Sequence, residues 1–206
     1  FGERIYSIKK FNFDYFSLDG SSQLIAKTGY SRIGGFEIYL SRPELGSSLW
    51  ETILEAGRSE NIRPGSPNII DRVEAGLLSF GNEMTVENTP LECNMDKFLD
   101  INKKADYIGK KVLQRQIRYG IKRRIRGVIY NGPKLPTISR PLQVFDIDKR
   151  TIVGSLTSGA FSPHFKRNIG VGMIKYGYWD NNKKILVNIA DQEFREGLIK
   201  DLPLIQ

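Results

Sequence analysis

Two side chains that could act together on a ligand lie one residue apart in the chain, Glu37 and Tyr39. Residues 36–40 (FEIYL) predict a short β-strand, and alternate residues of a strand project from the same face. A carboxylate can accept paired hydrogen bonds from N–H donors, and the face of a tyrosine ring attracts cations. The pattern by itself favours a solvated glutamate and a packing tyrosine at a strand edge, so other features must decide between the two interpretations.

Other reactive side chains are few. The single cysteine, Cys93, can form neither an internal disulfide nor a cysteine-based metal cluster, and we expect it to pack as a small apolar group. The single histidine, His164, is expected in a surface loop. Arg72 could bind a ligand carboxylate or form an ion pair with a neighbouring acid such as Glu74. We predict no catalytic side chain, no Ser/His/Asp triad and no metal site.

Apolar spacing predicts a mixture of helices and strands in the first half of the chain. The expected strands are residues 11–16, 24–26 and 36–40, and the expected helices are residues 49–57, 67–77 and 107–119. We expect Ser66 to cap the second helix, with Pro67 in its first turn. We expect Asp106 to cap the third helix and Gly120 to end it.

The pattern of predicted secondary structure changes between residues 92 and 105. Beyond this point come short β-rich runs, at residues 126–130, 142–145, 151–157, 169–174 and 185–189. Turn residues separate these runs, a pattern that is typical of a small barrel or sandwich. The predicted fold class is therefore α+β, with a β-rich C-terminal part.

The composition indicates an ordinary globular protein with an excess of positive charge. Of 206 residues, 40% are hydrophobic and 26% are charged, and the net charge is +8. This charge could attract nucleic acid or a polyanionic cofactor, but the densest basic run, residues 122–126 (KRRIR), is expected to be the solvated start of a strand. We expect a small-molecule substrate, no nucleic acid and no membrane as partners, with homodimer formation left open. The single cysteine fits a reducing, cytoplasmic location.

Five sequence blocks resemble, in order, the motifs of the glycine-cleavage T-protein (aminomethyltransferase) family. The blocks are residues 29–38 (GYSRIGGFEI), 72–84 (RVEAGLLSFGNEM), 89–92 (TPLE), 107–113 (YIGKKVL) and 154–163 (GSLTSGAFSP). The family pattern for the first block is Gly-Tyr-Thr-Gly-Glu-x-Gly-Phe-Glu-Ile, and the second begins Arg-Leu-Glu-Ala-Gly. Because the blocks keep the family order across residues 24–175, the chain is identified as a member of this family.

The resemblance implies an organisation of the chain and a set of site residues. Residues 1–92 would be the C-terminal half of a folate-binding domain, residues 93–105 a connector, and residues 106–206 a C-terminal β-barrel domain. A roughly equal length of N-terminal chain is expected to be missing from this sequence. The implied cofactor is tetrahydrofolate as methyl acceptor, without a metal. The implied cofactor-binding residues are Glu37, which would hold the pterin ring, with Tyr39, Tyr30 and Arg72, and Tyr39 would also contact the donor.

Departures from the T-protein pattern resemble the dimethylsulfoniopropionate demethylase branch of the family. Residues 31–33 (SRI) replace Thr-Gly-Glu, and residues 66–69 (SPNI) replace Gly-(Ala/Val)-Arg-Asp, whereas residues 81–90 (GNEMTVENTP) are similar to the demethylases. This resemblance implies an enzyme that transfers a methyl group from dimethylsulfoniopropionate to tetrahydrofolate, although the 206 residues alone are expected to be inactive.

Three alternatives remain open from the sequence. The first is an aminomethyltransferase of the glycine cleavage system. The second is a non-catalytic folate-binding relative, but such relatives carry Lys-Gly-Cys-Tyr-x-Gly-Gln where this chain has residues 104–110 (KADYIGK). The third is a basic nucleic-acid-binding module, which only the net charge supports.

Overall fold

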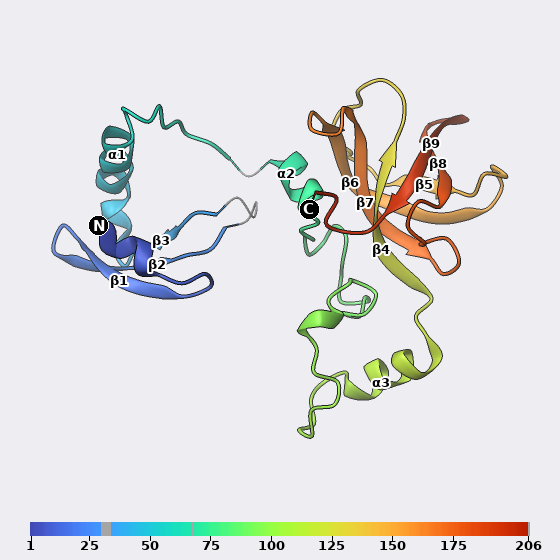
Figure 1. The fold of residues 1–206 in the computed structure, drawn as a ribbon, viewed down its shortest axis with the longest axis horizontal. Helices are drawn as coiled ribbons and strands as arrows, with labels where there is room; N and C mark the ends of the chain where they lie inside the picture. Colours follow the sequence, from blue (N-terminus) through green and yellow to red (C-terminus); the bar gives the residue numbers. More distant parts are fainter. Residues whose placement is uncertain (30–33, 67, 206) are drawn as a thin grey trace. The chain divides into compact units, whose positions relative to one another are not determined.

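The computed structural model describes residues 1–29, 34–66 and 68–205, and these residues form two compact units, Phe1–Pro67 and Asn68–Gln206. Figure 1 labels the elements of both units.

The first unit is a small antiparallel sheet with one longer helix. Its elements are the 3-10 helix η1 (Glu3–Ser7), the strands β1 (Phe13–Leu18), β2 (Ser21–Ala26) and β3 (Glu37–Tyr39), the 3-10 helix η2 (Pro43–Leu45) and the helix α1 (Gly46–Ala56). The sheet has the order β1-β2-β3, so β2 pairs with both neighbours. Asp19 (φ 47°) and Gly20 (φ 72°) form the turn between β1 and β2 in a left-handed conformation that Asp and Gly tolerate better than other residues. The three expected strands and the first expected helix are confirmed.

The two faces of this sheet differ in burial. One face packs a core cluster of Ile8, Phe16 and Ile25. The aromatic residues that alternate along β1 lie on the other face, where Phe13 is 57% exposed and Tyr15 is 55% exposed. The apolar alternation thus locates the strand correctly, but its aromatic side is the open side of the sheet in the described residues.

The second unit is built on a closed barrel. Its elements are α2 (Ile69–Glu74), the 3-10 helix η3 (Asp96–Phe98), α3 (Lys110–Tyr119) and the strands β4 (Arg123–Tyr130), β5 (Leu142–Phe145), β6 (Ile152–Ser162), β7 (Arg167–Lys175), β8 (Lys184–Ala190) and β9 (Glu193–Lys200). The strands close in the order β4-β7-β6-β5-β8-β9, and every pair is antiparallel. The predicted α+β class with a C-terminal barrel is confirmed.

The barrel interior is filled by β-branched and aliphatic side chains from these strands, together with Tyr130. Burial raises the pKa of the Tyr130 hydroxyl to about 12. At the β6–β7 contact the backbones approach so closely that a Cβ at Gly172 would lie 1.9 Å from the Ser155 carbonyl oxygen. Only glycine therefore fits position 172.

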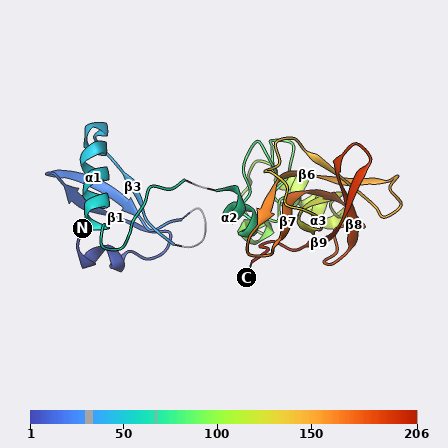
Figure 2. The ribbon, with the colours of Figure 1, turned by 90° about the horizontal axis from the view of Figure 1, so that it is seen from above.

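The helix α2 differs from its prediction at its start and in its burial. Asn68 caps it, because the Asn68 side chain accepts a hydrogen bond from the Asp71 backbone N–H at 2.8 Å, so the prediction of Ser66 as the cap was wrong. Pro67 lies outside the described residues. The helix lies against β6 and β7, which Figure 2 shows from above, and even Arg72 and Glu74 are buried.

The helix α3 begins four residues after its predicted cap. Gly109 (φ 88°) precedes the helix, and the Asp106 carboxylate accepts a hydrogen bond from the adjacent Tyr107 backbone N–H instead, so the prediction of Asp106 as the cap was wrong. The helix ends at Gly120 (φ 84°), as predicted. Only Leu113 of this helix is buried.

The compact units divide at a different position from the domains predicted by sequence, residues 1–92, 93–105 and 106–206. The difference arises because α2 and the residues that follow it pack on the barrel strands. Those domain boundaries stay a prediction. Among the described residues, none of the helices has the length and apolar character needed to cross a membrane.

Candidate functional site

Strand β3 places the carboxylate of Glu37 and the ring of Tyr39 on one face of the first unit's sheet. Glu37 is the cross-strand partner of Ala26, and Tyr39 is the partner of Leu24, so the two side chains share a face as their spacing predicts. The Tyr39 hydroxyl lies 3.4 Å from Oε2 of Glu37. The hydroxyl of Thr28 also donates a hydrogen bond to Oε2 of Glu37.

The Glu37 carboxylate is exposed and is only partly used by the protein. Both contacts from neighbouring hydroxyls go to Oε2, and within residues 1–29, 34–66 and 68–205 no hydrogen bond or ion pair reaches Oε1. A carboxylate offers about four lone-pair sites, so most of this acceptor capacity is open to a ligand.

Exposed aromatic rings extend the same face towards β1. Phe13 pairs with Ala26, and Tyr15 pairs with Leu24, so the rings belong to the cross-strand rows that end in Glu37 and Tyr39. The Phe13 and Tyr15 rings meet edge to face with centroids 6.0 Å apart. Tyr39 is 55% exposed. This face therefore combines a carboxylate acceptor with several ring surfaces that can receive a flat heterocycle or a cation.

The remaining two predicted site residues contribute differently. Tyr30 lies outside the described residues. Arg72 belongs to the second unit, where its guanidinium donates to both carboxylate oxygens of Glu83 at 2.8 and 3.1 Å, to Ser158 and to the Leu77 carbonyl. The Arg72 side chain is 6% exposed. Of the two interpretations of Arg72, the structure shows the ion pair, with Glu83 as the partner in place of Glu74.

The buried Glu74 accepts a hydrogen bond from the Ser162 hydroxyl on β6. The two polar contacts, from Arg72 to Ser158 and from Ser162 to Glu74, fasten α2 to the same strand. A buried charge needs such partners to offset its lost hydration. These residues thus serve the attachment of α2 to the barrel.

The cysteine and the histidine lie where the sequence placed them. Cys93 is 4% exposed and packs in the cluster between α2 and the barrel. Burial, with a smaller contribution from the nearby Glu92 carboxylate, raises the pKa of the Cys93 thiol and so disfavours the nucleophilic thiolate. His164 is exposed in the turn between β6 and β7. The described residues hold no group of three or more His, Cys, Asp or Glu side chains placed to bind a metal ion.

The basic run at the start of β4 is paired with carboxylates. Arg123 contacts Glu92 at 3.1 Å, Arg124 contacts Asp96 at 3.7 Å, and Arg126 contacts Asp201. The prediction that this run begins a strand is confirmed, but the run is less solvated than expected, because the Arg126 side chain is only 13% exposed.

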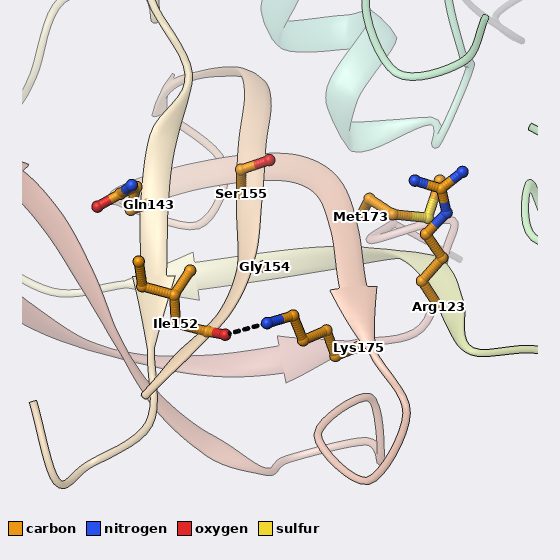
Figure 3. Close-up of a pocket in the computed structure, with 7 residues that line it drawn as sticks. All are labelled: Arg123, Gln143, Ile152, Gly154, Ser155, Met173 and Lys175. Carbon is orange, nitrogen blue, oxygen red and sulfur yellow. Dashed lines mark hydrogen bonds between the residues drawn. The ribbon is translucent and has the colours of Figure 1, made fainter. Parts of the chain in front are cut away.

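A surface groove on the barrel is shown in Figure 3. It is lined by Arg123, Gln143, Ile152, Gly154, Ser155, Met173 and Lys175. Lys175 donates to the Ile152 carbonyl at 2.7 Å, and Arg123 is held by Glu92, so both cations of the lining already have partners. None of the predicted site residues lines this groove.

Sequence reasoning missed three side chains of the sheet face, Phe13, Tyr15 and Thr28. The alternation of aromatic residues in β1 is a signal for the first two, but it does not tell which face is open. Thr28 lies two residues beyond Ala26, and the pairing of Ala26 with Glu37 is what brings the threonine to the carboxylate. That pairing is a property of the folded sheet and has no signal in the local sequence.

Comparisons with known proteins match the chain along most of its length. The family description "GCVT N-terminal domain" matches residues 5–103, and "Glycine cleavage T-protein C-terminal barrel domain" matches residues 123–202. The chain is 40% identical over 179 residues to dimethylsulfoniopropionate demethylase DmdA of Ruegeria pomeroyi. This aligned region makes up 87% of this chain and 48% of that protein. The chain is also 36% identical over 200 residues to an aminomethyltransferase of Caldanaerobacter subterraneus. That aligned region makes up 96% of this chain and 52% of that protein.

A solved structure has the same fold. The glycine cleavage system aminomethyltransferase T of Bartonella henselae aligns with a TM-score of 0.80 at 21% identity, over 97% of this chain and 54% of that protein. The chain spans about half the length of the curated relatives it matches. Both domain descriptions and these relatives indicate the same family. The chain therefore belongs to the glycine cleavage T-protein family.

Proposed function

We propose that the protein is a tetrahydrofolate-dependent methyltransferase that takes its methyl group from dimethylsulfoniopropionate. The observation that carries this proposal is the exposed sheet face on which Glu37 and Tyr39 lie together, in a chain 40% identical to a dimethylsulfoniopropionate demethylase. The departure of residues 66–69 from the T-protein motif and the similarity of residues 81–90 to the demethylases support the demethylase branch.

The Glu37 carboxylate suits the pterin ring of tetrahydrofolate. A pterin presents an amino group and a ring N–H side by side, and a carboxylate accepts such a pair in a planar, charge-assisted arrangement. The open Oε1 of Glu37 and the remaining lone pairs of Oε2 provide the two acceptors. The exposed ring of Tyr39 lies beside Glu37 on the same face, and the exposed rings of Phe13 and Tyr15 extend that face across β2, so that the face can stack on a flat heterocycle.

Tyr39 also suits a sulfonium donor, because its ring face attracts a permanent positive charge. The sulfonium supplies the electrophilic methyl carbon: the sulfur keeps the electron pair of the broken C–S bond, the folate nitrogen forms the new bond and its proton leaves. The protein's main contribution is then to hold donor and acceptor in line, for which orientation matters more than acid–base catalysis.

Of the two remaining predicted folate contacts, Tyr30 and Arg72, only Tyr30 is kept in this proposal. Tyr30 is retained as a proposed folate contact. Arg72 is assigned to the support of α2, because a contact with folate would require it to leave Glu83 and Ser158.

Aminomethyl transfer in glycine cleavage is the second candidate function. Its support is the identity of 34 to 37% with several aminomethyltransferases over about half of their length. A non-catalytic folate-binding role is a third candidate, which would retain the Glu37 site and lose the donor.

The donor decides between these functions. The complete gene product is incubated with tetrahydrofolate and either dimethylsulfoniopropionate or an aminomethyl-lipoyl carrier protein, and the folate product is identified by mass. The proposal expects 5-methyltetrahydrofolate from the sulfonium. Turnover of the lipoyl donor alone would assign the protein to glycine cleavage, and folate binding without turnover of either donor would leave the third candidate.

A further inference from the structure

The Thr28 hydroxyl makes one of the two polar contacts to the Glu37 carboxylate within the described residues. Thr28 follows the last residue of β2 by two positions, and its hydroxyl donates to Oε2 of Glu37 across the β2–β3 pair. The other contact to this oxygen, from the Tyr39 hydroxyl, is long at 3.4 Å. Both hydroxyl contacts thus fall on the same carboxylate oxygen.

This arrangement fixes the rotation of a carboxylate that lies on an open surface. A glutamate side chain has three rotatable bonds before its carboxylate, and in water it samples many orientations. A hydrogen bond from Thr28 to Oε2 selects the orientations in which Oε2 meets the threonine and Oε1 does not. The ligand then meets a carboxylate whose orientation is already restricted, and less conformational entropy is lost on binding.

We infer that Thr28 is a positioning residue for the pterin: its hydroxyl orients the Glu37 carboxylate so that Oε1 and the remaining lone pairs of Oε2 can accept the paired donors of the folate ring. This inference rests on the proposed function. Thr28 acts through Glu37 and has no contact of its own with the ligand.

The alternative is that Thr28 only stabilises the end of β2. Thr28→Val removes the hydroxyl and keeps the size and the branched Cβ, and Thr28→Ser keeps the hydroxyl. Loss of one net hydrogen bond corresponds to roughly a fivefold change in an equilibrium constant. The complete gene product is used, and tetrahydrofolate binding is measured by titration calorimetry alongside the unfolding temperature of each variant.

The inference expects the dissociation constant for tetrahydrofolate to rise about fivefold in Thr28→Val, with an unfolding temperature close to that of the parent. Thr28→Ser is expected to bind like the parent. In a Glu37→Ala background, Thr28→Val is expected to add nothing, since the hydroxyl acts only through the carboxylate. The matched control is Thr52→Val, whose hydroxyl bonds to the Ser48 carbonyl within α1, and it is expected to leave binding unchanged.

The outcomes separate this inference from the function on which it rests. A parent protein that binds no tetrahydrofolate overturns the proposed function and the inference together. A parent that binds, with Thr28→Val binding equally well, overturns the inference alone. Equal losses in Thr28→Val with and without the Glu37 carboxylate, or a loss that Thr28→Ser shares, would also overturn it, because the hydroxyl would then not act through Glu37.

Discussion

At the scale of single residues, the account depends on one carboxylate and one aromatic ring on the open face of a three-stranded sheet. Glu37 and Tyr39 were identified from their spacing and from the family motif, and the register of β2 with β3 places them together. Arg72 shows the limit of motif transfer. Arg72 is the residue type that the motif requires at this position, but its guanidinium forms an ion pair with the buried Glu83, eleven residues further along the chain.

We predict that Glu37→Gln weakens tetrahydrofolate binding by roughly 10- to 100-fold, because the amide replaces one charged acceptor oxygen by an N–H donor that opposes the pterin donors. Titration calorimetry on the complete gene product measures this change. The matched control is Glu51→Gln, an exposed position on α1 in the same unit, where binding should not change. If Glu37→Gln binds as tightly as the parent, the pterin lies elsewhere.

We predict that the two substitutions at Tyr39 separate the ring from the hydroxyl. Tyr39→Phe keeps the ring face and should keep most of the affinity for dimethylsulfoniopropionate, whereas Tyr39→Ala should lose roughly 1–2 kcal/mol of donor binding. The Michaelis constant for the donor, at saturating tetrahydrofolate, is the measurement. Equal donor affinity in the two variants would remove Tyr39 from the donor site and leave the folate site intact.

At the scale of elements, α2 is held to the barrel by buried charge. Its residue Arg72 reaches Glu83, whose side chain is fully buried, and Ser158 on β6, while Glu74 accepts from Ser162 on the same strand. A helix of six residues has little stability of its own, so these contacts and the apolar packing of Val73 define it.

We predict that Arg72→Met destabilises the protein by about 3–5 kcal/mol, because it leaves the Glu83 carboxylate buried without its counter-ion. Chemical denaturation of parent and variant gives the difference in the free energy of unfolding. The control is Arg58→Met, which removes an exposed ion pair with Glu55 and should change stability by less than about 1 kcal/mol. A loss at Arg72 no larger than at Arg58 would mean that the buried pair contributes little.

Most elements were predictable from the sequence, and the exceptions have physical reasons. Periodicity located the strands of the first unit and five of the six barrel strands. The missed strand, β9 (Glu193–Lys200), closes the barrel between β4 and β8. Its charged residues and its glycine hide the apolar pattern, and Gly197 is buried where a Cβ would lie 2.9 Å from the Tyr130 Cβ. The caps of α2 and α3 were misplaced because several residues nearby could cap, and the tertiary packing selects among them.

The candidate site was likewise predictable only in part. Alternation along residues 36–40 placed Glu37 and Tyr39 on one face without reference to the rest of the fold. The contact from Thr28 depends on which residue of β2 pairs with Glu37, and the exposure of Phe13 and Tyr15 depends on which face of the sheet holds the core. Both are properties of the assembled sheet.

At the scale of the whole molecule, the excess of positive charge, +8, does not gather as free cations in the densest basic run. The arginines of the densest basic run, Arg123, Arg124 and Arg126, each lie against a carboxylate. Cations that already have partners make a weak site for phosphates.

We predict that binding to duplex or single-stranded nucleic acid is weak and disappears near physiological salt, because only counterion release from scattered lysines and arginines would drive it. Fluorescence anisotropy with labelled oligonucleotides over a range of salt concentrations tests this. Submicromolar, sequence-selective binding at physiological salt would contradict it and would favour a nucleic-acid-binding module.

The central claim is that a methyl group moves from a sulfonium to tetrahydrofolate on the face formed by Glu37 and Tyr39. The most direct measurement follows dimethylsulfoniopropionate carrying a labelled S-methyl group through turnover by the complete gene product and by its Glu37→Gln variant. The account predicts that the label appears in 5-methyltetrahydrofolate, that 5-methyltetrahydrofolate and the thioether product form in equal amounts, and that the variant needs a higher tetrahydrofolate concentration. Absence of labelled 5-methyltetrahydrofolate, with tetrahydrofolate bound and an aminomethyl-lipoyl donor consumed, would contradict it.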